Sequence, residues 1–245
     1  MADHCKTAVV TGSSRGIGAA IAERLAKDGF NVIVNFSGSP APAENLVAKI
    51  EKEGGKARSF RADVSDPVAV ARLWDVAEAA FGGVDVLVNN AGIMRLATIA
   101  ESDDGLFNQQ ISINLKGTFN MLREASRRLN QGGSIVNLST SQTAMLHPTY
   151  GVYAATKAAI EAMTTILAKE MRGRSITVNA VAPGPTGTAL FFDDRPQEVI
   201  DHFAKLAPLE RIGSPAEIAN VVSFLVGPDG AWINGQTLRA NGGII

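Results

Sequence analysis

The stretch Thr7-Ala8-Val9-Val10-Thr11-Gly12-Ser13-Ser14-Arg15-Gly16-Ile17-Gly18 joins a short apolar run to a glycine-rich turn. The apolar residues predict a buried strand over Thr7–Thr11, and apolar residues at helical spacing follow over Gly16–Lys27. Glycine in the turn permits positive φ angles and a close approach of a ligand to the backbone. The free N–H groups at the start of the helix favour an anion such as a pyrophosphate. The stretch therefore predicts a dinucleotide site, and a tight turn without a ligand is the alternative.

The spacing of these glycines differs from the common G-x-G-x-x-G pattern, because three residues separate the first two glycines and one separates the last two. The order strand, glycine turn, helix nevertheless places the turn where nucleotide-binding sheets hold their ligand. We predict that the turn contacts a cofactor through Gly12, Ser14, Arg15, Gly16, Ile17 and Gly18.

Short β-rich runs alternate with longer helical patterns along nearly the whole chain. The predicted strands are Thr7–Thr11, Asn31–Asn35, Ala57–Ala62, Val84–Asn89, Ser134–Leu138, Ser175–Ala180 and Gln236–Leu238. The predicted helices are Gly16–Lys27, Ala43–Glu53, Pro67–Phe81, Asp104–Leu129, Tyr153–Met171 and Pro215–Val226. This alternation predicts an α/β fold over residues 1–245, a single-domain, Rossmann-type, doubly wound parallel sheet with helices on both faces.

The stretch Pro183–Leu209 is the irregular part of this pattern. It holds four prolines, and the apolar Leu190, Phe191 and Phe192 stand beside Asp193, Asp194 and Arg195. We predict a loop or lid here, with a flexible substrate loop at about 185–208.

Composition narrows the classes of partner. Lys and Arg total 23 against 24 for Asp and Glu, so no basic excess favours nucleic acid or an anionic membrane. Cys5 is the only cysteine and the three histidines are scattered, so we expect no disulfide and no metal site. The polar segment Met1–Lys6 predicts neither a signal peptide nor a transmembrane span. We expect a cytoplasmic protein with a small-molecule partner.

The end of the second predicted strand distinguishes between cofactors, since an acidic residue there would bind the ribose hydroxyls of NAD. The strand ends Val34-Asn35-Phe36-Ser37, without a carboxylate. Arg15 in the glycine turn and the hydroxyl of Ser37 suit the 2′-phosphate of NADP. We therefore predict NADP(H), with Phe36 and Ser37 at the cofactor. A solvated Arg15 and a Phe36 that only packs are the alternative.

Two later strand ends fit the same ligand, because ligands of open α/β sheets bind beyond the carboxyl ends of the strands. Asp63 and Val64 follow the third strand, where a carboxylate suits the adenine amino group. The fourth strand ends Asn89-Asn90-Ala91-Gly92, and we predict cofactor contacts by Asn90, Ala91 and Gly92. A helix N-cap at Asp63 or its neighbours, and a structural role for Asn89 and Asn90, remain open.

Tyr153 and Lys157 are four residues apart in a strongly helical segment, so their side chains share one face. A phenol has a reference pKa of about 10, and a neighbouring ammonium lowers it. Such a pair suits proton exchange with an alcohol or carbonyl oxygen. An ordinary amphipathic helix with a partly buried tyrosine is the alternative.

These segments together resemble the short-chain dehydrogenase/reductase family from end to end. The matching pieces, in order, are Thr11 to Gly18, Asp63, Asn89 to Gly92, Asn114, Ser139-Thr140-Ser141, Tyr153 with Lys157, and Pro183-Gly184. Within the family the chain is most similar to the trihydroxynaphthalene-reductase-like and carbonyl-reductase members, through Asn179 to Gly184, Leu206 to Arg211 and Arg239 to Gly243. Sugar dehydrogenases and 3-oxoacyl reductases are looser matches.

The resemblance implies a role for each matched residue. Tyr153 would act as general acid in reduction and general base in oxidation. Lys157 would lower the pKa of Tyr153 and hold the nicotinamide ribose, while Asn114 would link Lys157 to solvent through a backbone carbonyl and a water. Pro183 and Gly184 would shape the nicotinamide pocket, with Thr186 and Thr188 near the carboxamide and phosphates. The family also implies a homotetramer.

One position departs from the family pattern. Counting back about thirteen residues from Tyr153, as the resemblance implies, the expected catalytic serine falls on Thr140. Its neighbours Ser139 and Ser141 would point to the opposite face of a strand. A threonine keeps the hydroxyl, and a one-residue change of the loop would bring Ser139 or Ser141 into the role instead.

The predicted function is reduction of a small ketone, quinone or hydroxylated aromatic by an NADP-dependent oxidoreductase that acts on CH-OH groups. The alternatives are a 3-oxoacyl-thioester reductase, a sugar dehydrogenase and a non-catalytic dinucleotide-binding sensor. The pair Tyr153 and Lys157 argues against the sensor.

Overall fold

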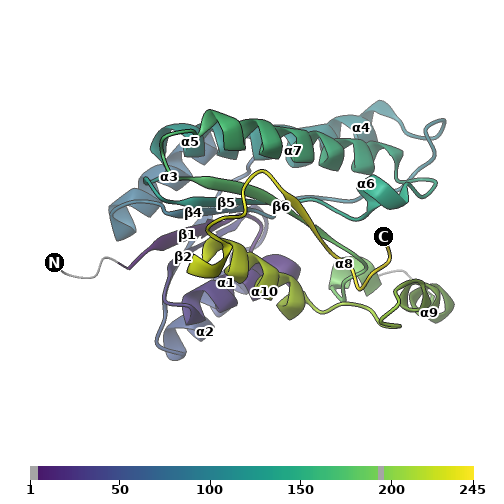
Figure 1. Cartoon of the computed structure of the whole chain (residues 1–245), viewed down its shortest axis with the longest axis horizontal. Helices are drawn as coiled ribbons and strands as arrows, with labels where there is room; N and C mark the ends of the chain where they lie inside the picture. Colours follow the sequence, from purple (N-terminus) through teal and green to yellow (C-terminus); the bar gives the residue numbers. More distant parts are fainter. Residues whose placement is uncertain (1–4, 193–195) are drawn as a thin grey trace.

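A single parallel sheet forms the centre of the computed structural model, which describes residues 5–192 and 196–245. Seven strands lie in the order β3-β2-β1-β4-β5-β6-β7, all parallel (Figure 1). They are β1 (Thr7–Val10), β2 (Asn31–Phe36), β3 (Lys56–Arg61), β4 (Val86–Asn89), β5 (Ser134–Leu138), β6 (Thr177–Pro183) and β7 (Thr237–Ala240). The chain order reverses between β1 and β4, which is where open α/β sheets bind ligands beyond the strand ends.

Helices cover both faces of the sheet and bury a separate apolar core on each side (Figure 1). One face carries α1 (Gly16–Lys27), α2 (Ala41–Lys52) and α10 (Pro215–Val226), the other α3 (Pro67–Phe81), α5 (Thr118–Arg128) and α7 (Gly151–Glu170). The central strands β1 and β4 are buried along their whole length, because both of their faces are covered. The predicted fold class is confirmed.

Several element bounds differ from the prediction by a few residues. The largest difference among the strands is in β6, which runs to Pro183 instead of ending at Ala180. It extends because β7 continues beside it, pairing Pro183 with Ala240. Its start moves to Thr177 because Ser175 has a φ of 54° and so belongs to a turn.

The predicted helix Asp104–Leu129 is three segments. An α-helix, α4 (Asp104–Gln110), leads into a π-helix, η1 (Ile111–Gly117), and then into α5. Apolar residues keep a helical spacing through the whole region, so the sequence pattern does not indicate where the α-helix changes to a π-helix. Such π-helical turns are frequent at functional sites.

The predicted loop over Pro183–Leu209 is partly helical, which corrects the prediction of an irregular stretch. It contains α8 (Ala189–Phe192) and α9 (Gln197–Leu206). Asp193, Asp194 and Arg195 lie outside the described residues. Edge-to-face aromatic contacts connect the two helices, with the rings of Phe191 and Phe203 5.8 Å apart.

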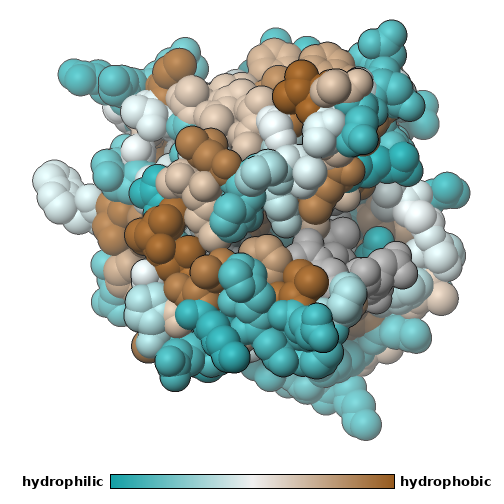
Figure 2. Space-filling view, turned by 90° about the vertical axis from the view of Figure 1, so that its right-hand side faces the viewer, coloured by the Kyte–Doolittle hydropathy of each residue, from teal (hydrophilic) through white to brown (hydrophobic). Residues whose placement is uncertain are grey.

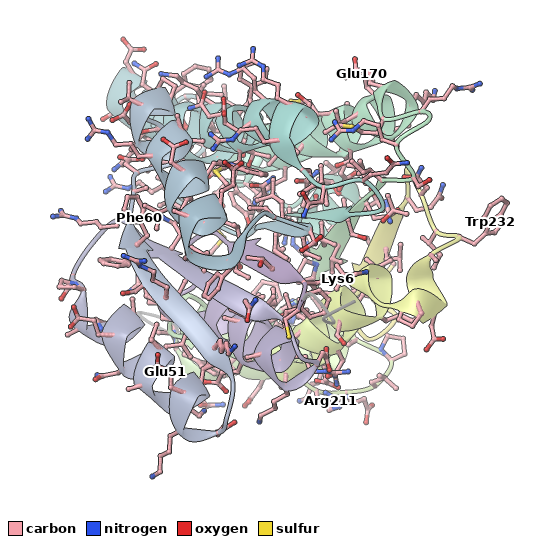
Figure 3. The ribbon with its side chains drawn as sticks, turned by 90° about the vertical axis from the view of Figure 1, so that its left-hand side faces the viewer. Lys6, Glu51, Phe60, Glu170, Arg211 and Trp232 are labelled. Atoms are coloured by element: carbon pink, nitrogen blue, oxygen red, sulfur yellow. The ribbon has the colours of Figure 1, made fainter. Side chains whose placement is uncertain are left out.

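The remaining elements are short. The loop after β5 contains α6 (Gln142–Met145), and a 3-10 turn, η2 (Pro228–Gly230), follows α10. Trp232, in the loop between η2 and β7, is 99% exposed and points away from the ribbon (Figure 3). Among the described helices, none has both the length and the apolar character that a membrane crossing requires.

Candidate active site

The glycine turn after β1 packs directly against the end of β4. Gly12 has a φ of 60°, and a β-carbon there would lie 2.8 Å from Ala91 Cα. A β-carbon at Gly18 would overlap Asn90 Nδ2 and the Gly12 carbonyl. Both positions therefore require glycine. The predicted turn residues Ser14 and Ile17 are half-buried at the start of α1, and Arg15 is exposed.

Asn90 holds this turn in place. Its backbone N–H donates to Thr11 Oγ1 at 3.0 Å, and its side-chain amide donates to the carbonyls of Thr11 and Gly12, both at 2.9 Å. Asn89 Nδ2 donates to Asn137 Oδ1 at 2.8 Å within the buried sheet. These contacts favour the structural role that the sequence left open for both asparagines, while Ala91 and Gly92 face the turn and Lys157.

One cation, Arg61, lies at the end of β2, where the sequence predicts the 2′-phosphate. Ser37 is exposed, and Arg61, at the end of β3, donates from Nε to the Ser37 carbonyl at 3.1 Å. Arg15 is exposed at the start of α1. Phe36 is only 6% exposed and belongs to the core cluster. Its side chain therefore packs in the core, which agrees with the alternative interpretation of Phe36 and not with a cofactor contact by its side chain. The strand end carries no carboxylate, which suits a phosphate better than a bare ribose.

The segment after β3 is tied into local structure. Asp63 is exposed, and its Oδ1 accepts from the N–H and hydroxyl of Ser65 at 2.9 and 2.8 Å. The N-cap of α3 is its neighbour Asp66, which accepts from Val68 N. Val64 is buried, and its carbonyl accepts from Asn120 Nδ2 at 2.9 Å.

Tyr153 and Lys157 lie on one face of α7, beside the end of β5. Lys157 is 4% exposed, and its Nζ donates to the Leu138 carbonyl at 2.7 Å. Nζ lies 6.0 Å from the centroid of the Tyr153 ring. A hydrogen bond joins the Tyr153 phenol to Thr140, the residue that the count from the family pattern selects. The predicted Tyr153, Lys157 and Thr140 are thus brought together.

Burial governs the ionisation of this pair. It raises the pKa of Tyr153 to about 12, and the hydrogen bond with Thr140 acts in the opposite direction. Burial lowers the pKa of Lys157 to about 8. The expected lowering of the phenol pKa by Lys157 is not found in this geometry, because the ammonium points to the Leu138 carbonyl instead of the phenol oxygen.

The neighbours of Thr140 are engaged elsewhere. Ser139 Oγ donates to Glu161 Oε1 on α7 at 2.5 Å, and Ser141 Oγ donates to the Ala182 carbonyl at 3.2 Å. Strand alternation predicts that Ser139 points away from α7, but its side chain instead reaches α7. The prediction fails because β5 ends at Leu138 and the alternation of side chains ends with the strand. Of the three hydroxyls, that of Thr140 is the one hydrogen-bonded to Tyr153.

Asn114 lies in the π-helix η1 and is fully buried. Its side chain binds both backbone groups of Ile93, accepting from the N–H at 2.8 Å and donating to the carbonyl at 2.9 Å. Its backbone carbonyl accepts from Thr118 Oγ1 at 2.7 Å. A β-carbon at Gly92 would lie 3.2 Å from Asn114 Oδ1 and 3.6 Å from Lys157 Nζ, so Gly92 separates these two side chains.

The segment after β6 completes the carboxyl edge. The Pro183 carbonyl accepts from Ser141 N at 2.9 Å, and Gly184 packs tightly against Asn241. Thr186 Oγ1 donates to the Gly184 carbonyl at 2.9 Å. Thr188 approaches the glycine turn, since a β-carbon at Gly16 would lie 3.5 Å from Thr188 Cγ2.

Figure 2 views the molecule from the side on which the strands end. Apolar side chains gather across the middle of this face (Figure 2). Exposed apolar residues of the segments that follow the strands include Ile99, Leu146, Phe192 and Leu209. Exposed apolar side chains on the face where the strands end suit an uncharged organic substrate.

A family model described as enoyl-(acyl carrier protein) reductase matches residues 12–245. A short-chain type dehydrogenase/reductase of Picea abies is 41% identical, over 97% of this chain and 92% of the relative. The chain belongs to the short-chain dehydrogenase/reductase family. An NADPH-dependent aldehyde reductase-like protein, chloroplastic, of Arabidopsis thaliana is 42% identical, over 98% of this chain and 94% of that protein.

Solved structures agree with this family. A short-chain dehydrogenase from Burkholderia cenocepacia in complex with NADP superimposes with a TM-score of 0.92 at 38% identity, covering 98% of this chain and 97% of the other. An angucycline C-6 ketoreductase with bound NADP has a TM-score of 0.92 at 35% identity, covering 98% and 95%. The predicted family and fold are confirmed, and the predicted cofactor matches the one that these two structures contain.

Three contributors to this short-chain dehydrogenase/reductase site escaped the sequence analysis. Asn35 accepts from Gly12 N at 3.2 Å and donates to the Ala62 carbonyl at 3.0 Å, so it ties the glycine turn to β3. Arg61 lies beside Ser37, and Glu161 holds Ser139. Asparagine at a strand end, arginine on an edge strand and glutamate on a helix are common on protein surfaces, so no pattern singled them out.

Proposed function

We propose that this protein is an NADP(H)-dependent carbonyl reductase, which transfers a hydride between nicotinamide and a ketone or aldehyde. The supporting observation is the meeting of Thr140, Tyr153 and buried Lys157 at the carboxyl ends of the strands, beside the glycine turn. A hydroxyl, a phenol and an ammonium in one place suit proton transfer to a carbonyl oxygen.

The residues present fit NADP(H). The glycine turn leads into the N-terminus of α1, whose free N–H groups suit a pyrophosphate. Arg61 and Ser37 supply a positive charge and a hydroxyl at the end of β2, where a 2′-phosphate would bind, and the exposed Arg15 at the start of α1 would add a second charge. Further along the edge, Pro183, Gly184, Thr186 and Thr188 would surround the nicotinamide end, and exposed Asp63 would face the adenine.

The chain's own groups account for the proton. With a pKa of about 12, Tyr153 is protonated at neutral pH and can donate its proton to the carbonyl oxygen of a substrate. Thr140 orients the phenol and offers a hydroxyl to the same oxygen. Lys157 would hold the ribose, and Asn114 would connect it to solvent. Bound NADPH would supply the hydride.

The test of this proposal begins with a fluorescence titration of the purified protein with NADPH and with NADH. We expect clear preference for NADPH. Oxidation of NADPH is then followed with a panel of aldehydes, ketones, quinones and hydroxylated aromatics, together with a 3-oxoacyl thioester and a sugar. Turnover of simple carbonyls is the expected result. Turnover of only the thioester or the sugar would transfer the assignment to that alternative, and binding without any turnover would favour a sensor.

Replacing Arg15 with alanine should weaken NADPH binding by about 10- to 100-fold, because a charge-assisted hydrogen bond contributes about 1.5–3 kcal/mol. NADH lacks the 2′-phosphate, so its dissociation constant should change by less than about twofold. Fluorescence titration of both cofactors measures this ratio. Arg61→Ala is the paired variant, with the same direction expected. Equal weakening of both cofactors would instead mean that Arg15 supports the glycine turn.

We also infer a homotetramer and a cytoplasmic location from the family resemblance and the composition. Light scattering of the purified protein measures the first. A monomer at micromolar concentration would contradict it.

A further inference from the structure

Two contacts join α7 to the segment 139–143 that follows β5. One is the hydrogen bond between Tyr153 and Thr140. The other is made by Glu161, two helical turns beyond Tyr153, whose Oε1 accepts from Ser139 Oγ at 2.5 Å and from Thr143 Oγ1 at 2.9 Å. Residues four apart share a helix face, so Glu161 follows Lys157 on the side of α7 that meets the strand ends.

The two partners of Glu161 stand on either side of Thr140 in the chain. Ser139 is 5% exposed and immediately precedes it. Thr143 reaches back to the Thr140 carbonyl, with Oγ1 and the carbonyl oxygen 2.9 Å apart. The Glu161 carboxylate therefore fixes the segment before and after the residue that binds Tyr153.

The chemistry of this contact is not that of a solvated surface glutamate. Glu161 is half-buried, and within residues 5–192 and 196–245 it forms no salt bridge. Its Oε1 instead accepts from two hydroxyl groups, those of Ser139 and Thr143. Backbone hydrogen bonds from Ser139 N to the Val181 carbonyl at 2.7 Å and from Ser141 N to the Pro183 carbonyl at 2.9 Å hold the main chain beside β6. The Glu161 contacts add a side-chain link from this segment to α7.

We propose that Glu161 is a positioning residue for the catalytic pair, acting through Ser139 and Thr143 to hold Thr140 against Tyr153. Glu161 touches neither substrate nor cofactor in this role. The inference rests on the proposed function for its kinetic consequence, but its structural consequence concerns Tyr153 alone and is measurable without turnover. Small displacements of a reacting group cost large factors in rate, so a loosened Thr140 should lower kcat.

The chain offers a direct probe, because it has only two tyrosines, Tyr150 and Tyr153. Tyrosine labelled with carbon-13 at Cζ gives one NMR signal for each, and Tyr150→Phe assigns them. In Glu161→Ala we expect the Tyr153 signal to move in the same direction as in Thr140→Val, because both lose the hydrogen bond to the phenol. Glu161→Gln, which keeps an acceptor oxygen, should move it less. Glu170→Ala is the matched control, since Glu170 is exposed at the end of the same helix (Figure 3).

Kinetics supply the second readout. Glu161→Ala should lower kcat by about tenfold and leave the KM for NADPH within about twofold, because neither Glu161 nor its partners Ser139 and Thr143 are among the residues assigned to the cofactor. Ser139→Ala should reduce kcat as well, and the double variant should be no worse than Glu161→Ala alone, since the two residues act through one contact.

An unchanged Tyr153 signal in Glu161→Ala would overturn the inference, as would additive losses in the double variant. If Glu161→Ala does not fold, Glu161→Gln and Ser139→Ala carry the same test, with a moved Tyr153 signal expected in each. Absence of wild-type turnover would count against the proposed function only, because the NMR comparison still decides the role of Glu161.

Discussion

Replacing Tyr153 with phenylalanine is expected to lower kcat by about 10²- to 10⁴-fold, the range that general acid–base groups contribute. The Tyr153 phenol supplies the proton that the carbonyl oxygen of the substrate needs, and this phenol is hydrogen-bonded to Thr140. The ring itself is retained, so the contact with Tyr150, 6.5 Å between centroids, persists. NADPH binding should therefore stay within about twofold of the wild type.

The matched control is Tyr150→Phe, the same loss of one hydroxyl three residues earlier. We expect a far smaller change in kcat, because Tyr150 is not the proposed proton donor and its ring lies beside that of Tyr153. Single-turnover measurements at saturating NADPH separate the chemical step from binding. If Tyr153→Phe retained wild-type turnover, another group would donate the proton and the mechanism proposed above would be wrong.

The sequence predicts the parts of this site whose signals are local. Tyr153 and Lys157 meet because four residues make about one helical turn, and that relation holds wherever the helix begins. The glycine turn is predictable because the φ of 60° at Gly12 is a local requirement that glycine meets, although the close contacts of Gly12 and Gly18 are with the distant Ala91 and Asn90. Thr140 follows by counting from Tyr153, because the family spacing crosses only one short loop.

Other parts depend on contacts that no local pattern carries. The π-helix that holds Asn114 has the same apolar spacing as the helices on either side of it. Phe36 stands at a strand end where a cofactor contact is plausible from sequence, yet its side chain turns into the core. Glu161 resembles a solvated helix residue until the fold brings Ser139 to it, 22 positions away in the chain. In each case tertiary packing decides between two roles that the sequence permits equally.

The segment after β6 illustrates a different difficulty. Its four prolines and its polar residues favour a loop, but α8 and α9 are helical between those prolines. The ring contact of Phe191 with Phe203 stabilises the two helices together, and His147 approaches Phe203 from the loop after β5, with ring centroids 6.2 Å apart. Such pairing of distant aromatic rings supplies helical stability that intrinsic propensity alone does not predict.

Replacing Lys157 with methionine is expected to remove turnover and, at neutral pH, to stabilise the fold. Burial lowers the pKa of Lys157 from 10.5 to about 8, so the unfolded chain binds a proton more tightly than the folded protein does. Below pH 8 the folded protein holds this charge at a cost of about 3 kcal/mol. Methionine fills similar space without the charge, so the variant avoids this cost. Losing the hydrogen bond to the Leu138 carbonyl destabilises the variant by about 1 kcal/mol and offsets part of the gain in stability.

The sign of the pH dependence follows from the same pKa values. Between pH 8 and 10.5 the folded wild type releases its proton before the unfolded chain does, so wild-type stability rises with pH in this window. Lys157→Met lacks this titration. We therefore expect the variant to be more stable by about 2 kcal/mol at pH 7, and the difference to shrink and then reverse as the pH approaches 10.5.

Urea unfolding of both proteins at intervals from pH 6 to pH 10 measures this difference, and Lys169→Met, exposed on the same helix, is the control that should show none of it. If the difference in the free energy of unfolding between Lys157→Met and wild type stayed constant from pH 6 to pH 10, Lys157 would not titrate in that range. If this difference in the free energy of unfolding shrinks as the pH rises, and the variant has lost turnover, the charged lysine beside Tyr153 lowers the stability of the fold but is needed for activity. That cost is expected of a group retained for chemistry, because a buried apolar residue at this position would give a more stable protein.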